Sequence, residues 1–289
     1  MKLRQAVIVV SLAFATVCEA ADNSGTGTPA VETEVAGFGD VSIIAGLRVW
    51  ANRWDINYIT REAFQTDPAD PSTLMLRDVN ATVASSQRIV PMPFLGIRTG
   101  NFLASVSYFP TTSYGDVDVL SDDIERDEVE LNIGYYVLPS VVVSLSYKTG
   151  EQSKLTDLVA DSTVKVSGIM LGASFSAPLS DRFSAYGNFA YGIGKSELKH
   201  FTFADGDDSL RGSYQIGEFG ISYGLSPDFG GPFLKGALLT LGFRSWTLTF
   251  DDVPLGTYSP AAPATPIAIQ KHDIRSSTDG IVLGFVGVF

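Results

Sequence analysis

The chain has 289 residues, of which 45% are hydrophobic and 18% are charged, and its formal net charge at pH 7 is −12. This acidic excess excludes a dedicated nucleic-acid binder, because such proteins neutralise phosphates with a basic surface. High apolar content with low charge density also excludes intrinsic disorder. After residue 20, however, no uncharged apolar run approaches the roughly 18 residues that a membrane-spanning helix needs.

The N-terminus has the pattern of a secretory signal peptide. Lys2 and Arg4 precede an apolar run over 6–17, and Ala20 is a small residue suited to the position before the cleavage site. Cleavage after Ala20 would remove the only cysteine, Cys18, so the exported protein would contain no disulfide. A lipoprotein acylated at Cys18 is the less favoured alternative, because that cleavage requires a small residue just before the cysteine.

The rest of the chain consists of segments in which apolar and polar residues alternate. In residues 128–137 the odd positions are apolar or aromatic, and the even positions are mostly acidic, amide or glycine. A period of two residues predicts a strand with one apolar and one polar face. Ten such strands are predicted: 41–52, 87–98, 101–110, 128–137, 141–148, 163–177, 182–195, 211–225, 233–250 and 275–289.

The links between these predicted strands alternate in length. The short links are 98–101, 138–140, 178–181 and 226–232, and the long polar ones are 59–86, 111–126, 149–162, 196–210 and 251–274. Short periplasmic turns and long extracellular loops are typical of outer-membrane barrels, whereas a soluble barrel has no reason to segregate them. We therefore predict an all-β fold, a transmembrane up-and-down antiparallel β-barrel of ten strands, with eight or twelve as alternatives.

Aromatic residues are expected at both membrane interfaces, because amphipathic rings favour the level of the lipid headgroups. The expected loop-end residues are Trp50, Trp54, Tyr58, Tyr108, Tyr147, Tyr191 and Trp246, and the turn-end residues are Tyr135, Phe183, Phe233 and Phe289.

The final strand alternates apolar residues at Ile281, Leu283 and Phe285 and ends on Phe289. This segment resembles the C-terminal signature of bacterial outer-membrane proteins, although Gly287 stands where a larger apolar residue is usual. The resemblance does not identify a subfamily. It implies location in the bacterial outer membrane, contact with lipid and lipopolysaccharide, and recognition of Phe285 and Phe289 as an assembly signal by the barrel-assembly machinery.

This reading divides the chain into three parts. We predict a signal peptide over 1–20, a flexible periplasmic N-terminal segment over 21–40 and the outer-membrane β-barrel over 41–289.

Charged residues are predicted inside the barrel among many small ones. The predicted lumen charges are Arg48, Glu130, Lys148, Glu218 and Arg244. In one interpretation these charges pair across the lumen and satisfy one another, as buried charges must. In the other, small residues clear a thin water path and the charges select solutes. Pairing is favoured, because ten strands leave a narrow bore.

An acidic loop is the second candidate site. Asp116, Asp118, Asp122 and Asp123 offer oxygen ligands of the kind that Ca²⁺ or Mg²⁺ prefers. The spacing of an EF-hand is absent, so a solvated acidic surface is the favoured interpretation. We therefore expect no metal site and no cofactor.

Catalysis is also not expected. The chain has two histidines, His200 and His272, both in or beside predicted loops. Lys271-His272-Asp273 with Asp116 and Asp118 is superficially similar to the omptin proteases, but the surrounding residues do not match that family. No serine lies in a Gly-x-Ser-x-Gly context.

The function predicted from the sequence is a structural or surface-exposed outer-membrane barrel with passive passage of small solutes. A narrow porin-like channel and a rim-located, omptin-like hydrolase are the alternatives. The sequence identifies no extracellular ligand.

Overall fold

The computed structural model describes residues 41–65, 74–115, 124–153, 163–199, 202–203, 205–225, 233–259 and 262–289. Among these residues no helix has the length and apolarity needed to cross a bilayer. The predicted signal peptide and N-terminal segment fall outside the described residues.

The described part of the chain is all-β and forms one antiparallel sheet. Neighbours in the sheet follow one another along the chain, except that β1 is flanked by both β2 and β3. The strands are β1 (Val41–Gln65), β2 (Leu74–Ala84), β3 (Arg88–Thr99), β4 (Phe102–Tyr114), β5 (Ile124–Leu138), β6 (Val141–Ser153), β7 (Thr163–Pro178), β8 (Phe183–Lys199), β9 (Ser209–Gly224), β10 (Gly236–Ser259) and β11 (Ala262–Val288).

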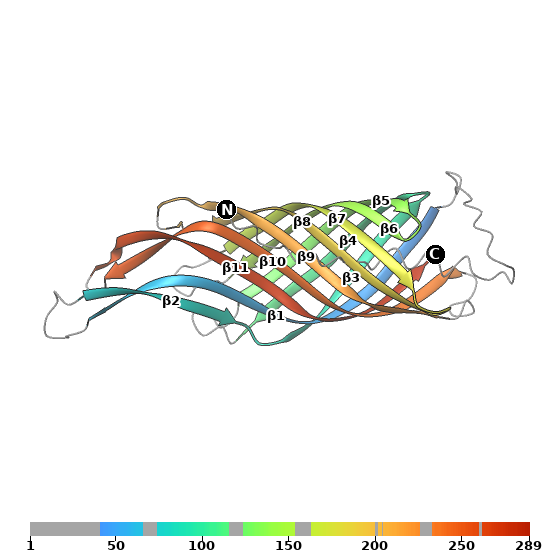
Figure 1. Cartoon of the computed structure of the whole chain (residues 1–289), viewed down its shortest axis with the longest axis horizontal. Helices are drawn as coiled ribbons and strands as arrows, with labels where there is room; N and C mark the ends of the chain where they lie inside the picture. The colour runs from blue at the N-terminus through green and yellow to red at the C-terminus, as the bar shows by residue number, and fades with distance from the viewer. Residues whose placement is uncertain are drawn as a thin grey trace.

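Pairing of β11 with β1 closes the sheet into a barrel (Figure 1). The pairing runs from Ile44 opposite Val288 to Tyr58 opposite Ile274. β2 and β3 pair with successive parts of β1, with a break at residues 85–87. Together they therefore occupy one strand position in the barrel wall. The barrel wall therefore has ten strand positions, and the predicted closed up-and-down topology is confirmed.

Two hairpins extend beyond the rest of the barrel at the end opposite the short turns. The β1–β2 hairpin continues to Gln65 opposite Leu74, and the β10–β11 hairpin continues to Ser259 opposite Ala262 (Figure 1). The prediction of loops over 59–86 and 251–274 was therefore wrong, since most of these residues are strand. Outside a hydrocarbon layer a strand needs backbone pairing but no apolar face, so the alternation used to recognise strands is lost there.

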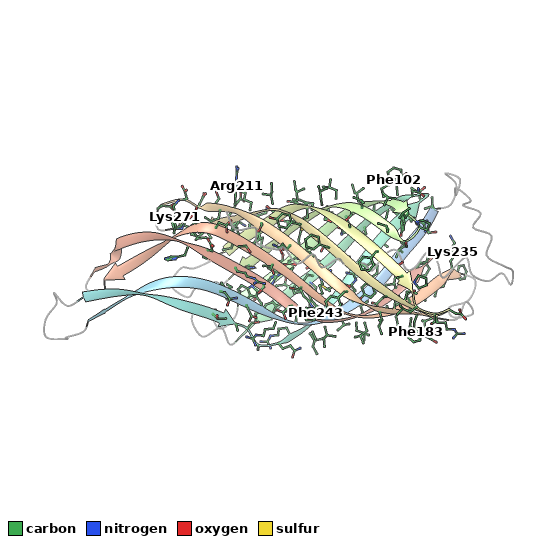
Figure 2. All side chains as sticks on the ribbon, in the orientation of Figure 1. Phe102, Phe183, Arg211, Lys235, Phe243 and Lys271 are labelled. Atoms are coloured by element: carbon green, nitrogen blue, oxygen red, sulfur yellow. The ribbon has the colours of Figure 1, made fainter. Side chains whose placement is uncertain are left out.

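The outer face of the barrel is a belt of exposed apolar side chains. Leu171 is 68% exposed, Ile193 72% and Leu241 49%, and each alternates with a residue that points inward. Figure 2 places Phe102 and Phe183 near the end with the short turns and Lys271 and Arg211 toward the other end. An apolar belt of this extent on a soluble protein would aggregate, whereas lipid solvates it.

The aromatic residues expected at the interfaces divide into two groups: most point outward, and the prediction was wrong for the tryptophans. Tyr108, Tyr135, Tyr147, Tyr191, Phe183, Phe233 and Phe289 are 41–81% exposed. Trp50, Trp54 and Trp246 are each 1% exposed and lie inside the barrel instead. The side chain of Tyr58 lies outside the described residues.

Candidate functional site

The lumen is filled by side chains in three layers, which follow from the order of inward residues along each strand. On β10 these are Leu238, Arg244 and then Trp246, proceeding from the short-turn end. The first layer is an apolar cluster of Ile44, Phe94, Leu103, Tyr136, Val142, Tyr186, Leu238, Val286 and Val288. The third is a larger cluster that includes Trp50, Trp54, Met92, Phe109, Tyr114, Met170, Tyr214, Trp246 and Leu248.

The middle layer is a charge network that crosses the lumen. Arg244 on β10 donates through Nη1 to Glu218 at 2.9 Å and through Nη2 to Glu130 on β5 at 3.0 Å. The Nη1 of Arg48 lies 3.6 Å from the same Glu218 carboxylate. The hydroxyl of Tyr186 also donates to Glu218, at 3.3 Å. Since β5 and β10 are not neighbours in the sheet, the Arg244–Glu130 bond ties opposite walls together.

The network continues toward the loop end through Glu128. Its carboxylate lies 2.6 Å from the Nζ of Lys148 and also pairs with Arg126. Arg126 donates through Nη1 to the hydroxyl of Thr278 on β11 at 2.7 Å, which is a second bond across the lumen. Of the five lumen charges predicted from the sequence, the structure brings Arg48, Glu130, Glu218 and Arg244 into direct contact and joins Lys148 to Glu128 instead.

Arg126 and Glu128 belong to this candidate site, and the sequence analysis did not include them among the lumen charges. The predicted strand began at 128, so Arg126 fell in a predicted loop, but β5 begins at Ile124. The sequence did contain the information. Arg126, Glu128 and Glu130 have residue numbers of the same parity (all even), so on one strand their side chains must point to the same side.

The internal tryptophans pack against the cations. The Cζ of Arg126 lies 4.0 Å from the ring centroid of Trp246, and the Nζ of Lys148 lies 5.0 Å from it. The ring of Tyr214 stacks on Trp246 with centroids 5.6 Å apart. Cation–π contacts are stronger away from water, so indole rings placed inside stabilise the buried charges. Their parity predicted this, since Trp50 and Trp54 share the parity of Arg48, and Trp246 shares that of Arg244.

Small inward residues make room for large ones. A Cβ added to Gly194 would lie 2.6 Å from a methyl carbon of Leu248, and one added to Gly46 would lie 2.5 Å from the Phe94 ring. These glycines therefore accommodate side chains from other strands, and the space that they leave is not a path through the barrel.

A polar chamber remains between the two apolar layers. Its volume is about 50 Å³, and its lining includes Arg48, Arg244, Glu130, two asparagines and five serines. The Nδ2 of Asn132 donates to Glu130 at 3.1 Å, and Ser146 is hydrogen-bonded to Asn132. The chamber is thus the part of the filled lumen where polar atoms face open space.

The other predicted site residues lie apart from the lumen network or outside the described residues. Asp116, Asp118, Asp122 and Asp123, like His200, lie outside the described residues, and the described ones contain no group of three or more His, Cys, Asp and Glu suited to a metal ion. Phe285 and Phe289 are 38% and 44% exposed on the outer face. His272 lies on β11 opposite Val253, and its Nε2 is buried with no hydrogen-bond partner among the described residues.

Neither a protein-family model nor a curated protein matches this chain. Solved structures with a similar backbone are bacterial outer-membrane β-barrels of several kinds. The outer membrane protease OmpT from Escherichia coli is 10% identical with a TM-score of 0.49, over 86% of this chain and 97% of that one. The attachment invasion locus protein Ail of Yersinia pestis is 11% identical with a TM-score of 0.29, over 83% and 99%. A Pseudomonas aeruginosa FadL homologue is 12% identical with a TM-score of 0.26, over 86% and 90%.

Proposed function

We propose that this protein spans the bacterial outer membrane as a barrel with a closed lumen and presents its two long hairpins at the cell surface. The observation that carries the proposal is the combination of an exposed apolar belt with a lumen filled by apolar layers and paired charges. The belt requires a hydrocarbon solvent, and the pairing of β11 with β1 closes the sheet, whose two end strands would otherwise expose unpaired backbone groups to it.

The filled lumen favours a structural or surface-exposed role over a channel. Passage of a solute would require Arg244 to leave two carboxylates that it bonds on β9 and β5. It would also require displacement of the ring stack of Tyr214 and Trp246. Breaking these ion pairs is costly, because a buried ion separated from its partner is left uncompensated.

Conductance in planar bilayers tests the closed lumen. We expect wild-type protein to insert without measurable steps of current. The Trp246→Ala variant, which removes one of the three indole rings of the third layer, should give small ones. The matched control is Tyr191→Ala, which removes an outward ring of the belt and should stay silent. Regular current steps from wild-type protein would instead support the narrow channel.

Thiol labelling tests the membrane orientation. The chain has one cysteine, Cys18, within the predicted signal peptide, so an introduced cysteine would be the only one in the exported protein. On intact cells a membrane-impermeant maleimide should label Lys271→Cys, near the long hairpins, and not Arg182→Cys, in the β7–β8 turn. Labelling of both or of the turn alone would contradict the proposed orientation.

The proposal extends to partners but assigns no catalytic chemistry. Lipid and lipopolysaccharide would contact the belt, and Phe285 and Phe289 on the outer face would be accessible to the barrel-assembly machinery. At the rim, His272 lies in a paired strand. Equal turnover of peptide and lipopolysaccharide by wild type and His272→Ala is expected, and a loss specific to the variant would favour the hydrolase.

A further inference from the structure

We propose that the polar chamber in the middle of the lumen binds a small monovalent anion of the size of a halide or nitrate. The inference concerns the interior of the folded barrel and does not depend on which membrane surrounds it. Three independent features of the chamber point to an anion: its charge, an unpartnered donor and its size.

The first feature is an excess of positive charge. The lumen network joins the cations Arg126, Lys148, Arg244 and Arg48 to the carboxylates Glu128, Glu130 and Glu218, so one positive charge is in excess. Cations and carboxylates alternate along this network, with Lys148 and Glu130 as cross-strand neighbours, and a cation stands at each end. Arg48 is the end that lines the chamber. Arg48 itself is paired with Glu218, and an anion in the chamber would balance the excess charge of the network as a whole, which burial disfavours.

The second feature is a buried donor without a partner. Arg244 is 5% exposed and lines the chamber, and its Nε–H has no hydrogen-bond partner among the described residues although both terminal nitrogens have one. A guanidinium N–H removed from water forms strong bonds with anionic acceptors. The serine hydroxyls and the asparagine amides of the wall are further donors to such an ion.

The third feature is the size of the chamber, together with a lining that favours an anion over a cation. A chamber of about 50 Å³ has room for roughly four water molecules, and so for one small ion with part of its hydration shell. A cation is disfavoured because the one carboxylate in the lining, that of Glu130, already accepts bonds from Arg244 and Asn132.

Two carboxylates at the nearby Lys148 end of the network do not cancel the excess. Asp127 and Glu151 have the opposite parity to Glu128 and Gln152 and belong to the outer face. Glu151 is there paired with Lys199 at 2.8 Å. Loss of a proton from Lys148 would remove the excess charge without an anion, and this alternative predicts no dependence on the anion supplied.

The experiment measures thermal unfolding of the purified folded barrel in neutral detergent, in sodium bromide, nitrate or gluconate at one ionic strength. We expect bromide and nitrate to raise the midpoint saturably, by about 5 °C, and the larger gluconate to have no such effect. In bromide-soaked crystals an anomalous peak should lie beside the Nε of Arg244. Equal midpoints in all three salts, with no peak, would mean that the chamber holds water alone and would overturn the proposal.

A chamber-filling variant keeps the test independent of the charges. Ser144→Val combined with Ser174→Val adds bulk to the lining while every ionic residue stays in place. We expect this variant to lose the bromide response, whereas Ser167→Val, on the outer face of β7, should keep it in full. A response that persists in the filled variant would place the anion elsewhere and contradict the proposal. Because all these measurements are made in detergent, they can fail while the membrane orientation holds, and the reverse is also true.

Discussion

The outer face and the lumen are built from the same strands but obey different rules. On β10, Leu239 and Leu241 are 42% and 49% exposed, whereas Arg244 and Trp246 on the opposite face are 5% and 1% exposed. Charges occupy the better-buried face because there each finds a partner on another strand. In the apolar belt of the outer face, the surrounding hydrocarbon offers a charge no partner. The parity of a residue, more than its exposure to water, therefore decides what a substitution costs.

The largest expected effect comes from breaking the lumen network at its centre. Glu218→Leu removes the carboxylate that Arg244 and Arg48 share and leaves both buried cations without it. We expect a loss of about 3–5 kcal/mol in the free energy of unfolding, the usual cost of stranding a buried charge. Denaturant titration of the barrel refolded into vesicles measures it.

An exposed ion pair provides the matched control. Glu197→Leu removes the partner of Lys195 on the outer end of β8, where both side chains are nearly half exposed. The free energy of unfolding should not change measurably, since water replaces the lost partner. A second comparison, Glu218→Leu with Arg244→Met, should recover part of the loss. Equal costs for Glu218→Leu and Glu197→Leu would show that the lumen is more hydrated than its packing indicates.

The next largest effect is expected from placing a charge in the belt. Leu171 is 68% exposed on the outer face of β7, between outward Ile169 and Ala173. We expect Leu171→Arg to lower the free energy of unfolding by about 2–4 kcal/mol in lipid, because no partner is available to the guanidinium in hydrocarbon. The matched variant Ser167→Arg lies nearer the loop end of the same face and should cost about 0–1 kcal/mol. If both variants behaved alike, the hydrocarbon layer would not lie where the belt places it.

The smallest effect is expected from a single internal hydrogen bond. The Nε1 of Trp54 donates to the hydroxyl of Ser276 at 2.9 Å inside the barrel. Trp54→Phe keeps an aromatic ring but leaves that hydroxyl without its donor, so we expect a loss of about 1–2 kcal/mol in the free energy of unfolding. Tyr191→Phe on the outer face should be neutral, and heat-modifiable migration on a gel can rank the two. A larger cost for Tyr191→Phe would mean that the outward hydroxyl has a partner in the lipid headgroups.

Sequence patterns predicted the fold better than the site. Alternation located ten strands, because lipid on one side of the wall forces apolar residues onto every second position. The same rule failed in the two long hairpins, where no lipid imposes it. Trp50 and Trp246 were misplaced for another reason: they were assigned by residue type to the membrane interface, although their parity matched Arg48 and Arg244.

The sequence by itself predicted an up-and-down barrel of ten strands, with eight or twelve as alternatives, and its alternation indicated which side chains share a face. Only the tertiary structure decided which inward residues meet. Arg244 reaches Glu130, and Arg126 reaches Thr278, across a lumen whose width and register follow from closure of the whole sheet. Parity is a local property of two neighbouring residues, whereas a contact across the barrel depends on the pairing register of every strand between its partners.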